Sequence, residues 1–212
     1  MTRIETIDQL RELYRAPSEL VRSKVQATLD SGTISFIERS PMVFLSTIGA
    51  DGHLDVSPRG GPSGFLRVLT NGTVAIPDLN GNNLLDTLEA IVATGRVGML
   101  FVLPGQCETV RVNGRAHISV DPEILTSFTP ELRTPRSAII VEPEEVFIHC
   151  AKAFRRGHVW DPDTWEALNA GPDVVDILYA QLALGEKGVD KAALRENFAK
   201  GYATELDQDK PE

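Results

Sequence analysis

The spacing of hydrophobic residues changes along the chain from a helical period to a strand-like one. Up to about residue 35, apolar residues recur at intervals of three and four, which predicts helix. Thr6 and Gln9 have the spacing of a capping box, and Pro17 is placed to open a helix over 18–29 that Gly32 would end. We therefore expect N-terminal helices over residues 1–35.

From Pro41 onward the period becomes two, as in strands with one buried face. Asn71 and Gly72 tolerate the positive φ of a type I′ turn and predict a tight hairpin, and Asn113 with Gly114 marks a second turn or a bulge. The predicted strands cover residues 42–48, 53–57, 66–70, 73–77, 97–103, 108–120 and 137–149.

Helical spacing returns in two places. A helix is expected over 83–94 with Gly95 as its stop, and further helices from about residue 161, including 173–184. The last ten residues, ATELDQDKPE, are polar, and we expect them to fray. The pattern predicts a mainly β protein with flanking helices (α+β). Its strands should form a six- to seven-stranded antiparallel barrel. We interpret residues 1–212 as a single domain: helices over 1–35, barrel over 36–150, helical extension over 151–212.

Composition and charge narrow the class of protein. Hydrophobic content is 42% and charged content 24%, as in ordinary globular chains. No segment approaches the roughly 18 consecutive apolar residues of a membrane helix, and the first 15 residues do not resemble a signal peptide. The net charge of −9 argues against nucleic acid and acidic membranes as partners. With Cys107 and Cys150 expected to be reduced, we predict a cytoplasmic protein.

The sequence lacks the familiar catalytic motifs. Its four histidines, His53, His117, His149 and His158, do not have the spacing of a metal site. There is no G-x-S-x-G elbow, Walker loop or G-x-G-x-x-G motif. We therefore predict no metal site, and we assign no side chain as a catalytic acid or base.

Two polar segments carry candidate binding chemistry. In DVSPRG, residues 55–60, Pro58 should stop the strand ladder and leave the Arg59 cation at the barrel rim. In AIPDLNGNN, residues 75–83, Asn80, Asn82 or Asn83 would cap the following helix, whose free N–H groups suit an anion. The alternative interpretations are a solvated edge arginine and a well-capped helix without ligand.

A third polar segment, ETVRVNG at 108–114, is a strand with Thr109 and Arg111 on one face and Val110 and Val112 in the core. In their order, the three segments resemble the pyridoxamine 5′-phosphate oxidase-like family of FMN-binding split barrels, over about residues 36–160. The run HCAKAFRR at 149–156, with Trp160, is similar to the end of an uncharacterised subgroup.

The resemblance implies a split β-barrel that forms a homodimer with FMN at the subunit interface and acts on a small molecule. It also implies a set of cofactor-binding residues. These are Val56, Ser57, Pro58, Arg59 and Gly60 on the rim strand, Ile76, Pro77 and Asp78 at the next strand end, Asn82 and Asn83 at the phosphate, Thr109 and Arg111 at the ring, and Lys152 and Arg156 from the partner.

Two departures from the family pattern shape the functional hypothesis. Asn82 and Asn83 stand where the oxidase has a basic pair, and Thr109 stands for a glutamine, so Arg59, Lys152 or Arg156 must supply the phosphate's counter-charge. The oxidase's substrate-phosphate residues are also not reproduced. We therefore expect an FMN-dependent oxidoreductase acting on something other than pyridoxamine phosphate. The alternatives are an F420-dependent reductase, a non-catalytic flavin- or haem-binding protein, and a dimer with a vestigial cleft.

Overall fold

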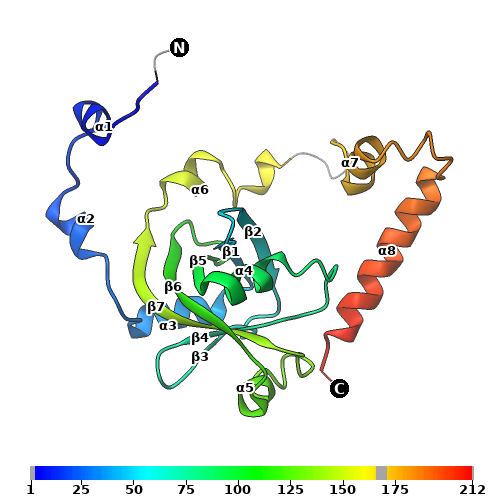
Figure 1. Cartoon of the computed structure of the whole chain (residues 1–212), viewed down its shortest axis with the longest axis horizontal. Coiled ribbons are helices and arrows are strands. Elements are labelled where there is room, and N and C mark those ends of the chain that lie inside the picture. The colour runs from blue at the N-terminus through cyan, green and yellow to red at the C-terminus, as the bar shows by residue number, and fades with distance from the viewer. Residues whose placement is uncertain (1–2, 166–170, 212) are drawn as a thin grey trace.

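Seven antiparallel strands form one sheet that curls into a half-barrel (Figure 1). The computed structural model describes residues 3–165 and 171–211, so residues 1–2, 166–170 and 212 of the predicted terminal segments lie outside the described residues. The strand order is β2-β1-β5-β6-β7-β4-β3. This confirms the predicted mainly β fold with flanking helices. The strands are β1 (Met42–Ile48), β2 (Leu54–Gly60), β3 (Arg67–Val68), β4 (Val74–Pro77), β5 (Arg96–Val102), β6 (Thr109–Ser119) and β7 (Ala138–His149).

The core lies on the concave side of the sheet. Side chains alternate along β1, so that Val43 and Leu45 are fully buried while their neighbours are exposed. Helices α3 (Ser31–Arg39) and α4 (Asp86–Thr94) pack against the sheet, α3 through the fully buried Ile37. The largest fully buried side chains are Phe65, Phe101 and Phe128. The Asn71–Gly72 hairpin joins β3 to β4, as the sequence predicts.

The Asn113–Gly114 pair makes a bulge in the long β6–β7 ladder. The register of the two strands shifts between these residues. A Cβ atom on Gly114 would lie 2.0 Å from the carbonyl oxygen of Glu142. Only glycine allows this close approach of the two backbones, which explains why the sequence has one here.

The rim strand is longer than predicted. Pro58 does not stop the ladder: β2 continues to Gly60, and Pro58 pairs with Phe44 of β1. The prediction was wrong because β2 is an edge strand, where the missing N–H of a proline leaves no neighbouring strand unsatisfied. As a result, the alternation of side chains along β2 continues to Arg59, which lies on the same face of the strand as Ser57.

The N-terminal helices are shorter and more separate than predicted. They are α1 (Ile7–Leu13), α2 (Glu19–Ser23) and α3. The Thr6 side chain caps α1, as expected. Gly32 does not end a helix, because the Asp30 carboxylate accepts the N–H groups of Gly32 and Thr33 and thereby begins α3 at Ser31.

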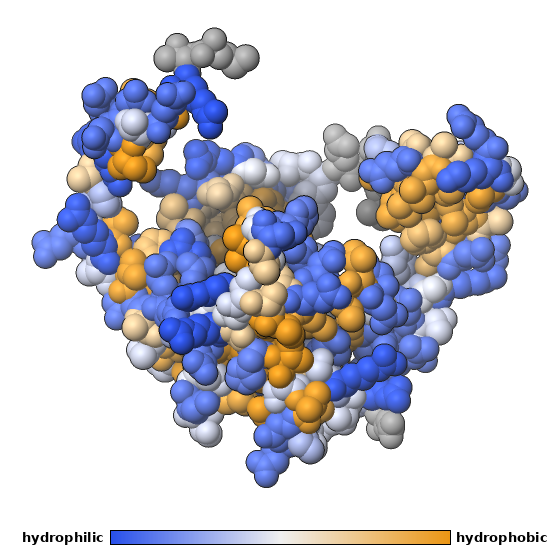
Figure 2. Space-filling model, viewed as in Figure 1, coloured by the Kyte–Doolittle hydropathy of each residue, from blue (hydrophilic) through white to orange (hydrophobic). Residues whose placement is uncertain are grey.

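Helix α5 (Pro122–Thr126) lies between β6 and β7 in the chain. After β7 come α6 (Lys152–Arg156), the 3-10 turn η1 (Pro162–Thr164), α7 (Val174–Gln181) and α8 (Lys191–Gln208). The predicted fraying of the last ten residues is wrong, since α8 continues to Gln208 and Asp209 bonds to the barrel. Figure 2 shows apolar side chains on the surface of α7. None of the described helices is long and apolar enough to cross a membrane.

Candidate functional site

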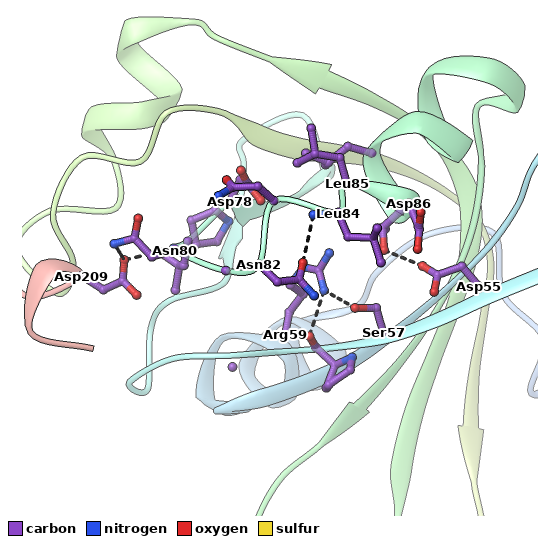
Figure 3. A pocket seen from close by; sticks show the side chains of 18 of the residues that line it. Asp55, Ser57, Arg59, Asp78, Asn80, Asn82, Leu84, Leu85, Asp86 and Asp209 are labelled. Carbon is purple, nitrogen blue, oxygen red and sulfur yellow. Dashed lines mark hydrogen bonds between the residues drawn. The ribbon is translucent and has the colours of Figure 1, made fainter. Parts of the chain in front are cut away.

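A pocket of about 440 Å³ lies between the rim strand β2 and the segment that links β4 to α4. Figure 3 shows Arg59 from β2 and Asn82 from the loop among the residues that line it. The pocket therefore brings together the two features that the sequence singled out, the cationic edge and the asparagine-rich loop. The predicted residues that line it are Ser57, Pro58, Arg59, Gly60, Pro77, Asp78, Asn82 and Asn83.

The β2 wall of the pocket follows from the period of two. Asp55, Ser57 and Arg59 are half-buried, whereas the residues between them are exposed. The Arg59 guanidinium donates to the carbonyl oxygen of Pro58 at 2.9 Å and to the Ser57 hydroxyl. Both acceptors belong to the same strand, so the guanidinium is held at the rim.

The opposite wall is a loop rather than a capped helix. Asn82 accepts a 3.0 Å hydrogen bond from the backbone N–H of Leu84, and α4 begins only at Asp86. The N-cap position is Leu85, in the left-handed conformation with φ of 64° and without a side-chain cap. The predicted asparagine cap is therefore wrong. The donors that face the pocket come from the loop, and the first turn of α4 carries its own acid, Asp86.

The pocket is more acidic than the sequence suggested. Within the described residues, its lining holds one basic side chain, Arg59, and four acidic ones, Asp55, Asp78, Asp86 and Asp209. Burial is the largest influence on the Asp78 carboxyl and holds its pKa above the ordinary value. The Asp209 charge also raises this pKa, and the Arg59 and Arg136 charges lower it. An anionic ligand is therefore attracted by Arg59 and repelled from the Asp78–Asp209 end.

Six of the predicted site residues do not line this pocket: Val56, Ile76, Thr109, Arg111, Lys152 and Arg156. Val56 points away from it and is 66% exposed, and Ile76 is fully buried. Lys152 and Arg156 lie on α6, which has no buried residue.

Thr109 and Arg111 lie on β6, in the same row of the sheet as the exposed side chains of β1. Arg111 forms an ion pair with Glu145, and its guanidinium carbon lies 5.3 Å from the centre of the Phe147 ring. Its buried Nε atom has no hydrogen-bond partner among the described residues. A single chain thus divides the predicted site between the pocket and the outer face of the sheet.

The C-terminal helix contributes pocket residues that sequence reasoning missed. Leu206 and Asp209 line the pocket, and Asp209 accepts hydrogen bonds from Asn80. Asn80 and Asp209 are 129 positions apart in the chain, and Asp209 lies in no segment that the sequence singled out. No local pattern in the sequence signals this contact.

The lining of the pocket offers donors that suit a phosphate group. Its volume lies within the range of roughly 300–1,000 Å³ that is usual for small-molecule sites. Arg59 supplies a cation, and Asn80, Asn82 and Asn83 supply amide groups from the loop. These are suitable donors for a phosphate, although the single charge is less than the oxidase pattern offers.

The family model for pyridoxamine 5′-phosphate oxidase matches residues 33–150, more than half of the 212-residue chain. No curated protein sequence matches the chain. Among solved structures, HupZ from Group A Streptococcus is 15% identical, with a TM-score of 0.47 over 57% of this chain and 94% of that one. A putative pyridoxamine 5′-phosphate oxidase from Lactobacillus delbrueckii is 21% identical, with a TM-score of 0.44 over 57% of this chain and 95% of that one. An F420 reductase is 18% identical, with a TM-score of 0.38 over 57% of this chain and 97% of that one.

Proposed function

The chain belongs to the pyridoxamine 5′-phosphate oxidase family, and on this basis we propose that it is an FMN-dependent oxidoreductase acting on a small molecule. The observation that carries the proposal is the convergence of Arg59 and the Asn80–Asn83 loop on one pocket of about 440 Å³. A cation and several amide donors around one cavity are suited to a phosphorylated ligand. We assign the activity to the cytoplasm, in keeping with the two free cysteines.

The roles of the residues follow from their chemistry. Arg59 binds the cofactor phosphate through charge-assisted hydrogen bonds, and Asn82 and Asn83 add neutral donors. Ser57 holds the Arg59 guanidinium at the rim. When bound, FMN would supply the redox chemistry between two substrates.

We propose that the ring end of the cofactor is completed by a second copy of the chain. The outer face of the sheet carries exposed apolar side chains on β1 and β2, which is the kind of surface that subunit interfaces bury. Thr109 and Arg111 lie on the same face, and the exposed Lys152 and Arg156 extend from α6. In a homodimer Arg111, Lys152 and Arg156 would reach the partner's pocket, whereas Thr109 is 5% exposed and stays buried in its own subunit. The exposed apolar residues are Met42, Phe44, Ile48, Leu54 and Val56.

The experiment that tests the proposed function is the identification of the cofactor. Purified protein should carry FMN, recognised by mass and by absorbance bands near roughly 370 and 450 nm. A single band near roughly 420 nm would instead identify the deazaflavin F420. FMN that stays oxidised with NADH, NADPH and a panel of amine donors would indicate a binding protein. A colourless protein that ignores added FMN would contradict the proposal.

A further inference from the structure

The end of the C-terminal helix closes one side of the pocket through a single carboxylate. Asp209 Oδ1 accepts the backbone N–H of Asn80 at 3.2 Å and the Asn80 side-chain amide at 3.0 Å (Figure 3). The Asp209 carbonyl accepts the N–H of Arg133 at 3.0 Å. Asp209 therefore occupies loop donors of the kind that a phosphate takes.

Asp209 also stands between two cavities. It lines the main pocket and a neighbouring cavity of about 160 Å³, whose lining includes Arg133 and Arg136. The two cavities share the loop from Asp78 to Gly81 as a wall. Moving Asp209 would therefore remove an acidic group from the linings of both cavities.

The attachment of this segment is slight compared with its length. Helix α8 has 18 residues, none of them buried. Arg195 holds α8 to α7 through ion pairs with Asp173 and Asp176, so the two helices form a unit of their own. A segment joined to the barrel by a few exposed hydrogen bonds opens at low free-energy cost.

We propose that the C-terminal segment 203–209 is a built-in competitor of the anionic ligand, with the Asp209 carboxylate occupying the Asn80 donors that a ligand phosphate would otherwise take. Binding of the ligand displaces the segment, and the attached segment places the Asp209 carboxylate in the pocket lining. The identity of the ligand as FMN rests on the proposed function, whereas the competition itself requires only a phosphate group.

Hydrogen exchange and flavin titration of the full chain test this proposal together. In the Asp209→Ala variant, exchange of segment 203–209 and loop 79–83 should increase on the order of tenfold without ligand. FMN affinity should rise roughly 2- to 10-fold, while affinity for riboflavin, which lacks the phosphate, should change less than about twofold. Asp207→Asn is the matched control, because Asp207 lies on the same helix but pairs with Lys210 outside the pocket. It should leave exchange and both affinities unchanged.

Inorganic phosphate separates this proposal from the proposed function. In the wild-type chain, phosphate or FMN should increase the exchange of segment 203–209 in proportion to occupancy. Release by phosphate without any FMN binding would support the competitor and contradict the flavin function. FMN binding that leaves the segment protected, with equal affinity in Asp209→Ala, would overturn the competitor and leave the flavin function standing. Exchange that neither phosphate nor FMN alters would also overturn it.

Discussion

The Thr87 hydroxyl donates a 2.6 Å hydrogen bond to Oδ2 of Asp55 and so joins the first turn of α4 to the rim strand β2. Thr87 is 3% exposed, and both residues line the pocket. This bond joins the strand that carries Arg59 to the helix that directly follows the asparagine loop. It therefore fixes the distance between the walls of the candidate site.

Removing this bond should cost stability. Thr87→Val keeps the shape of the side chain but loses the donor to a charged acceptor, so the free energy of unfolding should fall by about 1–2 kcal/mol. Urea unfolding provides the measurement. Thr126→Val is the control, because its hydroxyl bonds only to Pro122 within its own helix, and its stability should stay within about 0.5 kcal/mol. Equal effects of the two substitutions would remove the Asp55 contact from this account.

The bulge at Gly114 should not tolerate a side chain. Gly114→Ala would force the backbone of β6 away from Glu142, and we expect a loss of about 1–3 kcal/mol in unfolding free energy. Gly201→Ala should have the opposite effect, because Gly201 lies in α8 with open space around it. The free energy of unfolding of this variant should rise by up to about 1 kcal/mol. A neutral Gly114→Ala would show that the two strands are further apart than described.

Ionisation of Asp78 should oppose folding. Burial holds the pKa of Asp78 above its ordinary value, so the folded chain binds this proton more tightly than the unfolded chain. The contribution of Asp78 to stability is therefore lost as the pH rises through the folded pKa. Urea unfolding should therefore show that the free energy of unfolding of Asp78→Asn rises relative to that of wild type as the pH increases from about 3 to about 7. A constant difference across this range would contradict the raised pKa.

The outer face of the sheet should hold two copies together. We expect the wild-type chain to run as a dimer of twice 23.2 kDa in light scattering. Phe44→Asp places a charge among the exposed apolar residues of β1 and should produce monomers. Val92→Asp on α4 is the control, since Val92 is 77% exposed and lies away from this face. Dimers that survive Phe44→Asp would place the interface elsewhere.

The strands were predictable because their signals are local. The limits of β1 were predicted to the residue, as was the Asn71–Gly72 turn, because each depends on a few adjacent residues. Asn113 and Gly114 were predicted to form either a turn or a bulge, and the structure has a bulge there. The start of α4 was not, since the left-handed Asn83 and Leu85 delay the helix to Asp86. The Asp209–Asn80 contact joins distant segments through one carboxylate, which no period of the sequence reveals.

The role of Arg59 in holding the cofactor can be measured as the affinity of FMN for wild type and for Arg59→Ala, by quenching of flavin fluorescence. Arg59 is the basic side chain of the pocket, and loss of its charge-assisted bond should weaken binding by about 1–3 kcal/mol, or roughly 5- to 150-fold. Arg115→Ala, an exposed partner of Glu144, should bind as wild type does. Saturable binding of one FMN per chain that weakens only in Arg59→Ala is the predicted result. Equal affinities, or no binding to the wild type, would contradict the account.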